Sequence, residues 1–164
     1  MLIRRAATTA DLGSISAIYN YYVLNSTATF AIEQETMGER EQWFSEHAQT
    51  GMPIAVMEEE GQVVAFASLS KYHGRCGYRF TAEISLYVKN EHHRRGLGAI
   101  LVQEMLQAAD KLGMHAVLAI ICSENQGSIR LFEKFGFSQV GELKEVGEKF
   151  GRFLSVSILE RLLP

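Results

Sequence analysis

The stretch Arg94-Arg95-Gly96-Leu97-Gly98 is the part of this sequence where residue types and spacing most clearly suggest chemistry. It joins a segment that alternates like a strand, residues 82–88, to a segment with helical periodicity, residues 97–112. The first turn of a helix has unpaired backbone N–H groups and partial positive charge. Glycines allow an anion to approach that backbone closely. The junction therefore predicts a phosphate-binding site.

Two common phosphate-binding motifs do not fit this junction. A P-loop requires glycine, four residues and then Gly-Lys-Ser/Thr, which the stretch lacks. A dinucleotide fingerprint requires a third glycine three positions after Gly98, where Leu101 stands. Two glycines alone are equally compatible with a simple tight turn, so other residues must identify the phosphate.

Hydrophobic periodicity places the junction within a mixed α/β chain. The order of elements is one strand, two helices, three strands, a helix, a strand, a helix and two strands. A nearly continuous apolar run at 115–121 indicates a central strand covered on both faces. The predicted strands are 2–6, 53–59, 62–70, 82–88, 115–121, 137–147 and 152–162, and the predicted helices are 12–23, 39–49, 97–112 and 128–135.

Local signals support several of these boundaries. Thr8 followed by Asp11 matches a capping box before the first helix. Gly113 and Gly136 stand where C-terminal caps of the last two helices belong. Gly61 lies between two strand-like runs and predicts a hairpin turn.

Length and composition favour one domain over residues 1–164, with a core large enough to need no disulfide or metal. The net charge of −3 does not indicate a nucleic-acid-binding surface, and no apolar run is long enough for a membrane span. Cys76 and Cys122 are the only cysteines, and no signal peptide is apparent. We therefore expect a cytoplasmic protein with free thiols. His92-His93 lacks partner ligands at suitable spacing, so no metal site is expected.

The junction and the segment NQGSIRLFEKFGF (125–137) together resemble the GNAT family of acetyl-CoA-dependent N-acetyltransferases. That family has Gln/Arg-x-x-Gly-x-Gly/Ala at a helix start, followed by an Asn-x-x-Ser/Ala helix that ends in Gly-Phe. STATF (26–30), YRFTAEISLYV (78–88) and VGEKFGRF (146–153) are similar to the phosphinothricin and methionine sulfoximine acetyltransferase branch. The resemblance implies a single α/β domain with a central, mixed, strongly twisted sheet flanked by helices.

The resemblance also implies how acetyl-CoA would be held, with no metal. Backbone N–H groups from Arg95 to Ala99 would bind the pyrophosphate, with the Arg94 and Arg95 side chains nearby. The backbone of Tyr87-Val88 would pair with the pantetheine arm, and an N–H there would polarise the thioester carbonyl. The implied cofactor-binding residues are Leu86, Tyr87, Val88, Arg94, Arg95, Gly96, Leu97, Gly98, Ala99, Asn125 and Ser128.

Glu83 is the candidate general base that the resemblance implies. It precedes the cofactor segment on the same strand, on the face opposite Ile84 and Leu86. A positioned base contributes about 10²–10⁴-fold in rate. The alternative is a solvated glutamate on a half-exposed strand.

Three segments depart from the family pattern. His93 replaces Gln or Arg, and Phe132 replaces Tyr or His. Phe153-Leu154-Ser155 stands where branch members tend to have Trp-Leu-Asp. Phe132 cannot protonate the leaving thiolate. Water or another residue must supply that proton, or the thiolate departs unassisted. Tyr87 is a candidate donor, but a strand tyrosine also serves packing, so no general acid is assigned.

In the resembling branch the acceptor is a small amino acid that carries a phosphinate or sulfoximine. Its anionic groups call for a planar cation. Loop arginines can also be merely solvated, so the acceptor-binding residues remain candidates. They are Arg75 and Arg79 as cations, Phe30 and Tyr78 as walls, and Lys149 approaching from a neighbouring subunit.

A homodimer is what the branch implies, and Trp43 and Phe44 on the second helix could serve it or the core. Two alternative functions stay open. One is an N-acetyltransferase for a protein N-terminus, a polyamine or another amine. The other is a non-catalytic acyl-CoA-binding module, suggested by His93 and Phe132.

Overall fold

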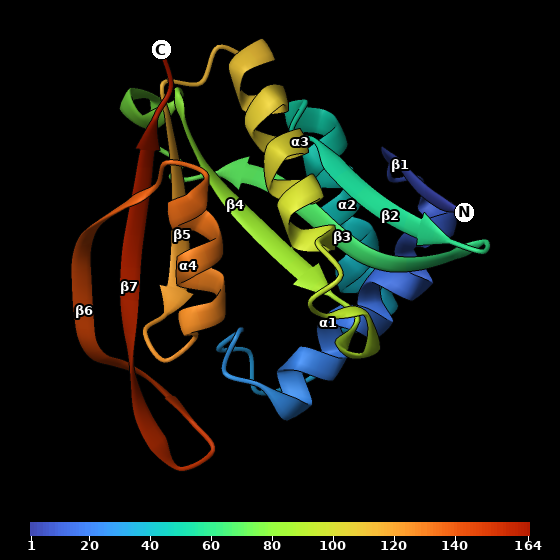
Figure 1. Ribbon diagram of the computed structural model, residues 1–164, viewed down its shortest axis with the longest axis horizontal. Helices are drawn as coiled ribbons and strands as arrows, with labels where there is room; N and C mark the ends of the chain where they lie inside the picture. The colour runs from blue at the N-terminus through green and yellow to red at the C-terminus, as the bar shows by residue number, and fades with distance from the viewer.

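Seven strands form one sheet in the computed structural model, which describes residues 1–164 (Figure 1). The strand order is β1-β2-β3-β4-β5-β7-β6. All neighbours are antiparallel except β4 and β5, so the sheet is mixed as expected. The strands are β1 (Leu2–Ala6), β2 (Ile54–Glu59), β3 (Gln62–Lys71), β4 (Thr81–Val88), β5 (Ala116–Cys122), β6 (Ser138–Lys149) and β7 (Arg152–Leu162).

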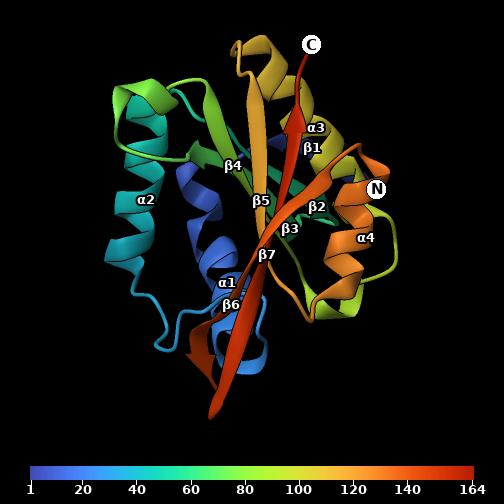
Figure 2. The same cartoon turned by 90° about the vertical axis from the view of Figure 1, so that its left-hand side faces the viewer.

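Four helices cover the two faces of the sheet, as Figure 2 shows. Helices α1 (Leu12–Asn25) and α2 (Met37–Thr50) lie on one face. Helices α3 (Leu97–Lys111) and α4 (Gln126–Lys134) lie on the other. Three short 3₁₀ turns, Thr9–Asp11, Cys76–Tyr78 and Asn90–His92, complete the regular structure. None of the helices combines the length and the hydropathy that a transmembrane helix needs.

The apolar periodicities explain which side chains each face buries. Leu97, Leu101 and Met105 of α3 lie on one stripe and pack into the larger of two cores. The continuous apolar strand β5 is buried on both faces except at Ile120, which confirms the prediction of a central strand. The aromatic side chains of α2, Trp43 and Phe44, pack against the smaller core under α1. Both are half-buried there, so they contribute to the fold.

The predicted caps are confirmed at three helix ends. Thr8 and Asp11 form the capping box, and the Arg5 guanidinium beside Asp11 lowers the pKa of that carboxyl to about 2. Gly113 and Gly136 follow α3 and α4 with φ of +68° and +78°, where a glycine avoids strain. Helix α4 begins two residues earlier than predicted because the Asn125 side chain caps it.

Strands β4 and β5 diverge in the middle of the sheet, and this divergence creates the site. Their parallel pairing covers only Thr81–Glu83 against Ala116–Leu118. On its other edge β4 stays paired with β3 through Val88. Figure 1 shows β4 and β5 separating toward their C-terminal ends. The β4 edge from Ile84 onward is therefore left without a strand partner.

Candidate active site

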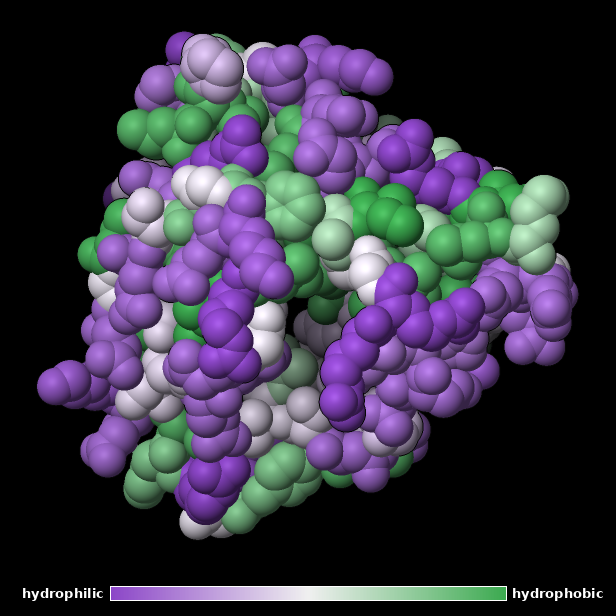
Figure 3. Space-filling model, in the orientation of Figure 1, coloured by the Kyte–Doolittle hydropathy of each residue, from purple (hydrophilic) through white to green (hydrophobic).

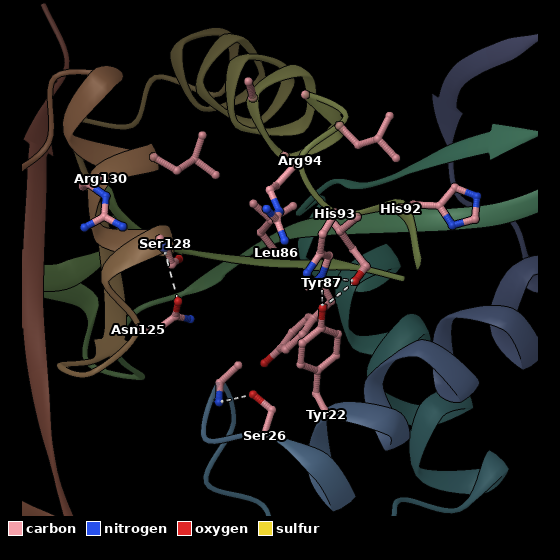
Figure 4. Close-up of a pocket in the computed structure, with 18 of the residues that line it drawn as sticks. Tyr22, Ser26, Leu86, Tyr87, His92, His93, Arg94, Asn125, Ser128 and Arg130 are labelled. Atoms are coloured by element: carbon pink, nitrogen blue, oxygen red, sulfur yellow. Dashed lines mark hydrogen bonds between the residues drawn. The ribbon is translucent and has the colours of Figure 1, made fainter. Parts of the chain in front are cut away.

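A cavity of about 1140 Å³ lies between the diverging strands (Figure 4). Its walls come from the end of β4, the loop before α3, the first turn of α3, helix α4 and the end of α1. Most of the cofactor-binding residues predicted from the sequence meet here. They are Leu86, Tyr87, Val88, Arg94, Gly96, Leu97, Gly98, Ala99, Asn125 and Ser128.

The open edge of β4 offers the backbone groups of alternate residues. The Lys89 N–H donates to the Val64 carbonyl of β3 at 2.8 Å. Because N–H and C=O groups of successive strand residues point to opposite edges, Leu86 and Val88 present theirs to the cavity. The Tyr87 backbone faces β3 instead, unlike our expectation that Tyr87 contributes backbone groups to a ligand. Its side chain packs against Tyr19, Tyr22 and Phe66.

Tyr22 and His93 both contact the Val88 carbonyl oxygen. The Tyr22 hydroxyl donates to that oxygen, and His93 Nε2 lies 3.0 Å from it and 2.6 Å from the Tyr22 oxygen. Burial raises the Tyr22 pKa to about 12, so the hydroxyl keeps its proton. His93, which departs from the family pattern, thus joins β4 to α1. Nothing in the sequence pointed to Tyr22, which is 66 residues from Val88.

The backbone before α3 has the conformation that its glycines allow. Gly96, at the start of the helix, has φ of +81°, a region that side-chain-bearing residues rarely adopt. At Gly98 an added Cβ would lie 3.1 Å from Leu131 Cδ2 and 3.4 Å from Leu86 Cδ2. Gly96 thus permits the left-handed turn, and Gly98 lets Leu131 and Leu86 pack against the first turn of α3, whose residues line the cavity.

Arg95 departs from the expected arrangement, because its side chain is directed away from the cavity. Its guanidinium donates to both carboxylate oxygens of Glu59 at 2.6 and 2.7 Å. His92 Nε2 lies 3.2 Å from the same carboxylate. The hydrogen bonds from Arg95 lower the Glu59 pKa to about 2, which keeps it ionised. Glu59, at the end of β2, thus holds the loop that precedes α3.

Replacing Glu59 with glutamine is expected to raise the KM for acetyl-CoA several-fold and to change kcat little. The substitution removes the charge that holds Arg95 and His92, so the loop becomes less ordered before the cofactor binds. Steady-state kinetics at varied acetyl-CoA would measure the change. Glu104→Gln, which removes an ion pair with Arg4 instead, is the matched control. An unchanged KM in Glu59→Gln would show that the ion pair does not support the cofactor loop.

Asn125 and Ser128 bring polar groups of α4 to the cavity (Figure 4). The Asn125 Oδ1 accepts the Ser128 N–H at 3.2 Å and caps the helix. This bond leaves the Asn125 amide hydrogens and the Ser128 hydroxyl available to a ligand. Beside them, Glu124 accepts from Thr27 at 2.8 Å and pairs with Arg152, which links the loop after α1 to α4 and β7.

Glu83 lies on β4, on the sheet face covered by α1 and α2. It is four residues before Tyr87, about 13 Å along the strand. Its side chain is half-buried and forms no ion pair, and burial raises its pKa. A raised pKa brings a carboxylate closer to what proton abstraction near neutral pH requires.

Phe132 is 3% exposed in the core beneath α3 and α4, with its ring centroid 5.1 Å from that of Phe137. It does not line the cavity. No donor group therefore reaches the cavity from this position of α4.

The residues predicted to bind the acceptor do not line the cavity. Arg75, Tyr78 and Arg79 are exposed in the loop before β4, and the Arg79 guanidinium lies 4.5 Å from the Phe80 ring centroid. Phe30 packs so closely on Gly147 of β6 that a Cβ at that glycine would overlap the ring.

Lys149 has a position that the sequence did not indicate. It is 2% exposed, and its ammonium donates to the carbonyls of Ser26 and Thr29 at 2.7 and 2.8 Å. Burial lowers its pKa. Lys149 thus fixes the loop after α1 within its own chain. This geometry argues against our expectation that its ammonium reaches an acceptor in a neighbouring subunit.

No group of three or more His, Cys, Asp or Glu side chains is placed to hold a metal ion.

Comparison with known proteins agrees with this geometry. Residues 15–137 match the model of the acetyltransferase (GNAT) family. The chain is 37% identical over 157 residues to an L-methionine sulfoximine/L-methionine sulfone acetyltransferase of Pseudomonas aeruginosa, covering 95% of this chain and 91% of that protein.

Two solved structures are similar over nearly the full chain. A phosphinothricin acetyltransferase from Sinorhizobium meliloti, in complex with acetyl-CoA, superposes with a TM-score of 0.96 at 34% identity, covering 99% of this chain and 88% of that one. A ribosomal-protein-alanine N-acetyltransferase from Brucella melitensis superposes with a TM-score of 0.96 at 36% identity, covering 98% and 99%.

Proposed function

Because this chain belongs to the GNAT family and is an acetyl-CoA-dependent N-acetyltransferase, we propose that it acetylates the amine of a small amino acid of the methionine sulfoximine or phosphinothricin type. The observation that carries this proposal is the similarity over 95% of the chain to an enzyme named for methionine sulfoximine. Exposed arginines beside the start of β4 agree with an anionic acceptor.

Acetyl-CoA would lie along the open edge of β4. Its pantetheine arm would pair with the Leu86 backbone and the Val88 N–H, because the Val88 carbonyl already accepts from Tyr22. The Asn125 amide would donate to the same arm. Its pyrophosphate would bind the N–H groups from Gly96 to Ala99 and the Arg94 side chain. This path is supported by the cavity walls and by the φ of Gly96.

Glu83 would accept a proton from the acceptor ammonium and leave a nucleophilic amine. The amine nitrogen would then bond to the thioester carbon. As the C–S bond breaks, the nitrogen would lose its second proton to water and become the neutral amide nitrogen. An N–H of the open β4 edge would stabilise the oxyanion that forms between these steps. Since Phe132 cannot donate, the thiolate would leave as the anion and take a proton from water. A thiol pKa of about 8.5 makes that departure feasible.

Thiol release from acetyl-CoA with L-phosphinothricin or L-methionine sulfoximine tests the acceptor. We expect saturable release above a no-acceptor blank with at least one of the two. Arg75→Gln or Arg79→Gln should raise the KM for the acceptor by about tenfold, because a charged hydrogen bond is lost. The KM for acetyl-CoA should not change. Release at the blank rate with both acceptors would refute the assignment.

A protein N-terminus is the second candidate acceptor. It is favoured by the similarity to the ribosomal-protein-alanine N-acetyltransferase. A peptide with N-terminal alanine in the same assay separates the two. A higher kcat/KM for the peptide than for both amino acids would support this second candidate.

The acetyltransferase would be a homodimer that buries the outer surface of the β6–β7 hairpin. Five apolar side chains on this hairpin are left exposed by the rest of the chain. They are Val140, Leu143, Val146, Phe150 and Phe153, the last of them 71% exposed. Phe153→Glu should convert the dimer to a monomer in sedimentation velocity. A wild-type monomer at micromolar concentration would exclude this surface as a stable interface.

A further inference from the structure

Three basic side chains line the cavity without an acidic partner: Arg94, Arg130 and Lys134. Glu124, the acid in the cavity wall, is already paired with Arg152. The chain as a whole has a net charge of −3. Unpaired positive charge concentrated in one cavity of an acidic protein indicates a ligand with several negative charges.

Two of these cations belong to α4 and lie on one of its faces. Arg130 and Lys134 are four residues apart, one helical turn. Glu133, the acid between them, does not line the cavity. Helix α4 thus presents a basic pair to the cavity without a neutralising neighbour.

This basic pair lies at the same end of the cavity as the glycine junction. Leu131, next to Arg130, packs on Gly98 in the first turn of α3. Asn125 is five residues before Arg130, about 7.5 Å along the helix axis. Arg94 and Arg130 lie on opposite sides of the cavity in Figure 4. In Figure 3 hydrophilic side chains flank the opening on both sides.

Acetyl-CoA has two separate phosphate groups, the pyrophosphate and the 3′-phosphate of the adenosine. The N–H groups of α3 and Arg94 account for the pyrophosphate. A phosphomonoester has a charge of about −1.5 to −2 at pH 7 and three acceptor oxygens. We propose that Arg130 and Lys134 bind the 3′-phosphate and make this enzyme select acetyl-CoA over its 3′-dephosphorylated form. This inference rests on the proposed path of acetyl-CoA.

Binding of acetyl-CoA and acetyl-3′-dephospho-CoA, measured by calorimetry, tests the assignment. Wild type should bind the dephosphorylated form at least tenfold more weakly, since charge-assisted contacts are lost. The double variant Arg130→Gln/Lys134→Gln should bind acetyl-CoA as weakly as wild type binds the dephosphorylated form. It should show no further loss when the 3′-phosphate is absent.

Two control variants make the result specific. Arg94→Gln should weaken both ligands by the same factor, because both contain the pyrophosphate. Lys111→Gln, at the far end of α3, should change neither. Thermal unfolding of each variant checks that it folds. If the double variant loses affinity for both ligands by the same factor, Arg130 and Lys134 contact the pyrophosphate instead. If the double variant keeps the wild-type affinity for both ligands, Arg130 and Lys134 do not contact the cofactor. Either result overturns the proposal. Because binding needs no acceptor amine, failure of the amino-acid assay would not affect this test.

Discussion

Replacing Glu83 with glutamine is expected to lower the turnover of amine acetylation by about 10²–10⁴-fold and to leave the affinity for acetyl-CoA unchanged. Glutamine keeps the size of the side chain but cannot accept the amine proton. Glu83 is on the α1/α2 face of β4, outside the residues that line the cofactor cavity, so cofactor binding should not depend on its charge. Turnover would be measured at saturating acetyl-CoA, and affinity by calorimetry.

Glu160→Gln on β7 is the matched control, because it removes another half-buried carboxylate from a strand outside the site. It should keep wild-type turnover. Turnover of Glu83→Gln within twofold of wild type would remove Glu83 from the mechanism and support the solvated-glutamate alternative.

The pH dependence should identify the same group. Burial raises the Glu83 pKa, and only the deprotonated carboxylate can accept a proton. In wild type kcat/KM should therefore fall as the pH decreases through this raised pKa. In Glu83→Gln this decrease of kcat/KM on the acidic side of the profile, the acidic limb, should disappear. A wild-type limb that persists in the variant would belong to another group, such as the acceptor amine.

The second large effect is expected at Gly96, where valine should weaken acetyl-CoA binding by about tenfold to a hundredfold. A left-handed φ of +81° is strongly unfavourable for a β-branched residue, so the backbone must move and its N–H groups leave their present direction. Losing one hydrogen bond to a charged group costs about 1.5–3 kcal/mol. Calorimetric titration with acetyl-CoA would measure the loss.

Gly113→Val is the control for strain alone. Gly113 has φ of +68° at the other end of the same helix, with open space around its missing side chain. Both substitutions should lower the melting temperature, but Gly113→Val should keep the wild-type affinity. Equal affinities in the two variants would show that the glycine junction does not hold the cofactor.

Most of the fold could be predicted from the sequence because it follows from local patterns. Alternation and helical periodicity identified every strand and every α-helix in order. Thr8, Asp11, Gly113 and Gly136 marked boundaries because capping depends on residues a few positions apart. The glycine junction also lies within one local segment, so the phosphate site could be proposed before the tertiary structure was considered.

The side-chain partners at the site depend on residues that are far apart in the chain. Arg95 turns to Glu59 across 36 residues, Tyr22 reaches Val88 across 66, and Lys149 reaches Ser26 across 123. No local pattern distinguishes an arginine that faces phosphate from one that faces a carboxylate, because the side chain can rotate toward either. The packing of the sheet and helices sets which partners come within reach.

The sequence by itself determined the order of the elements and the backbone that a phosphate can approach. Both depend on propensities and φ preferences of neighbouring residues. Only the tertiary structure decided which charges remain unpaired in the cavity. It brought Glu59 to Arg95 and left Arg94, Arg130 and Lys134 without acidic partners. The physical reason is that an ion pair forms only where the packing of the sheet and helices brings two charges to within about 4 Å.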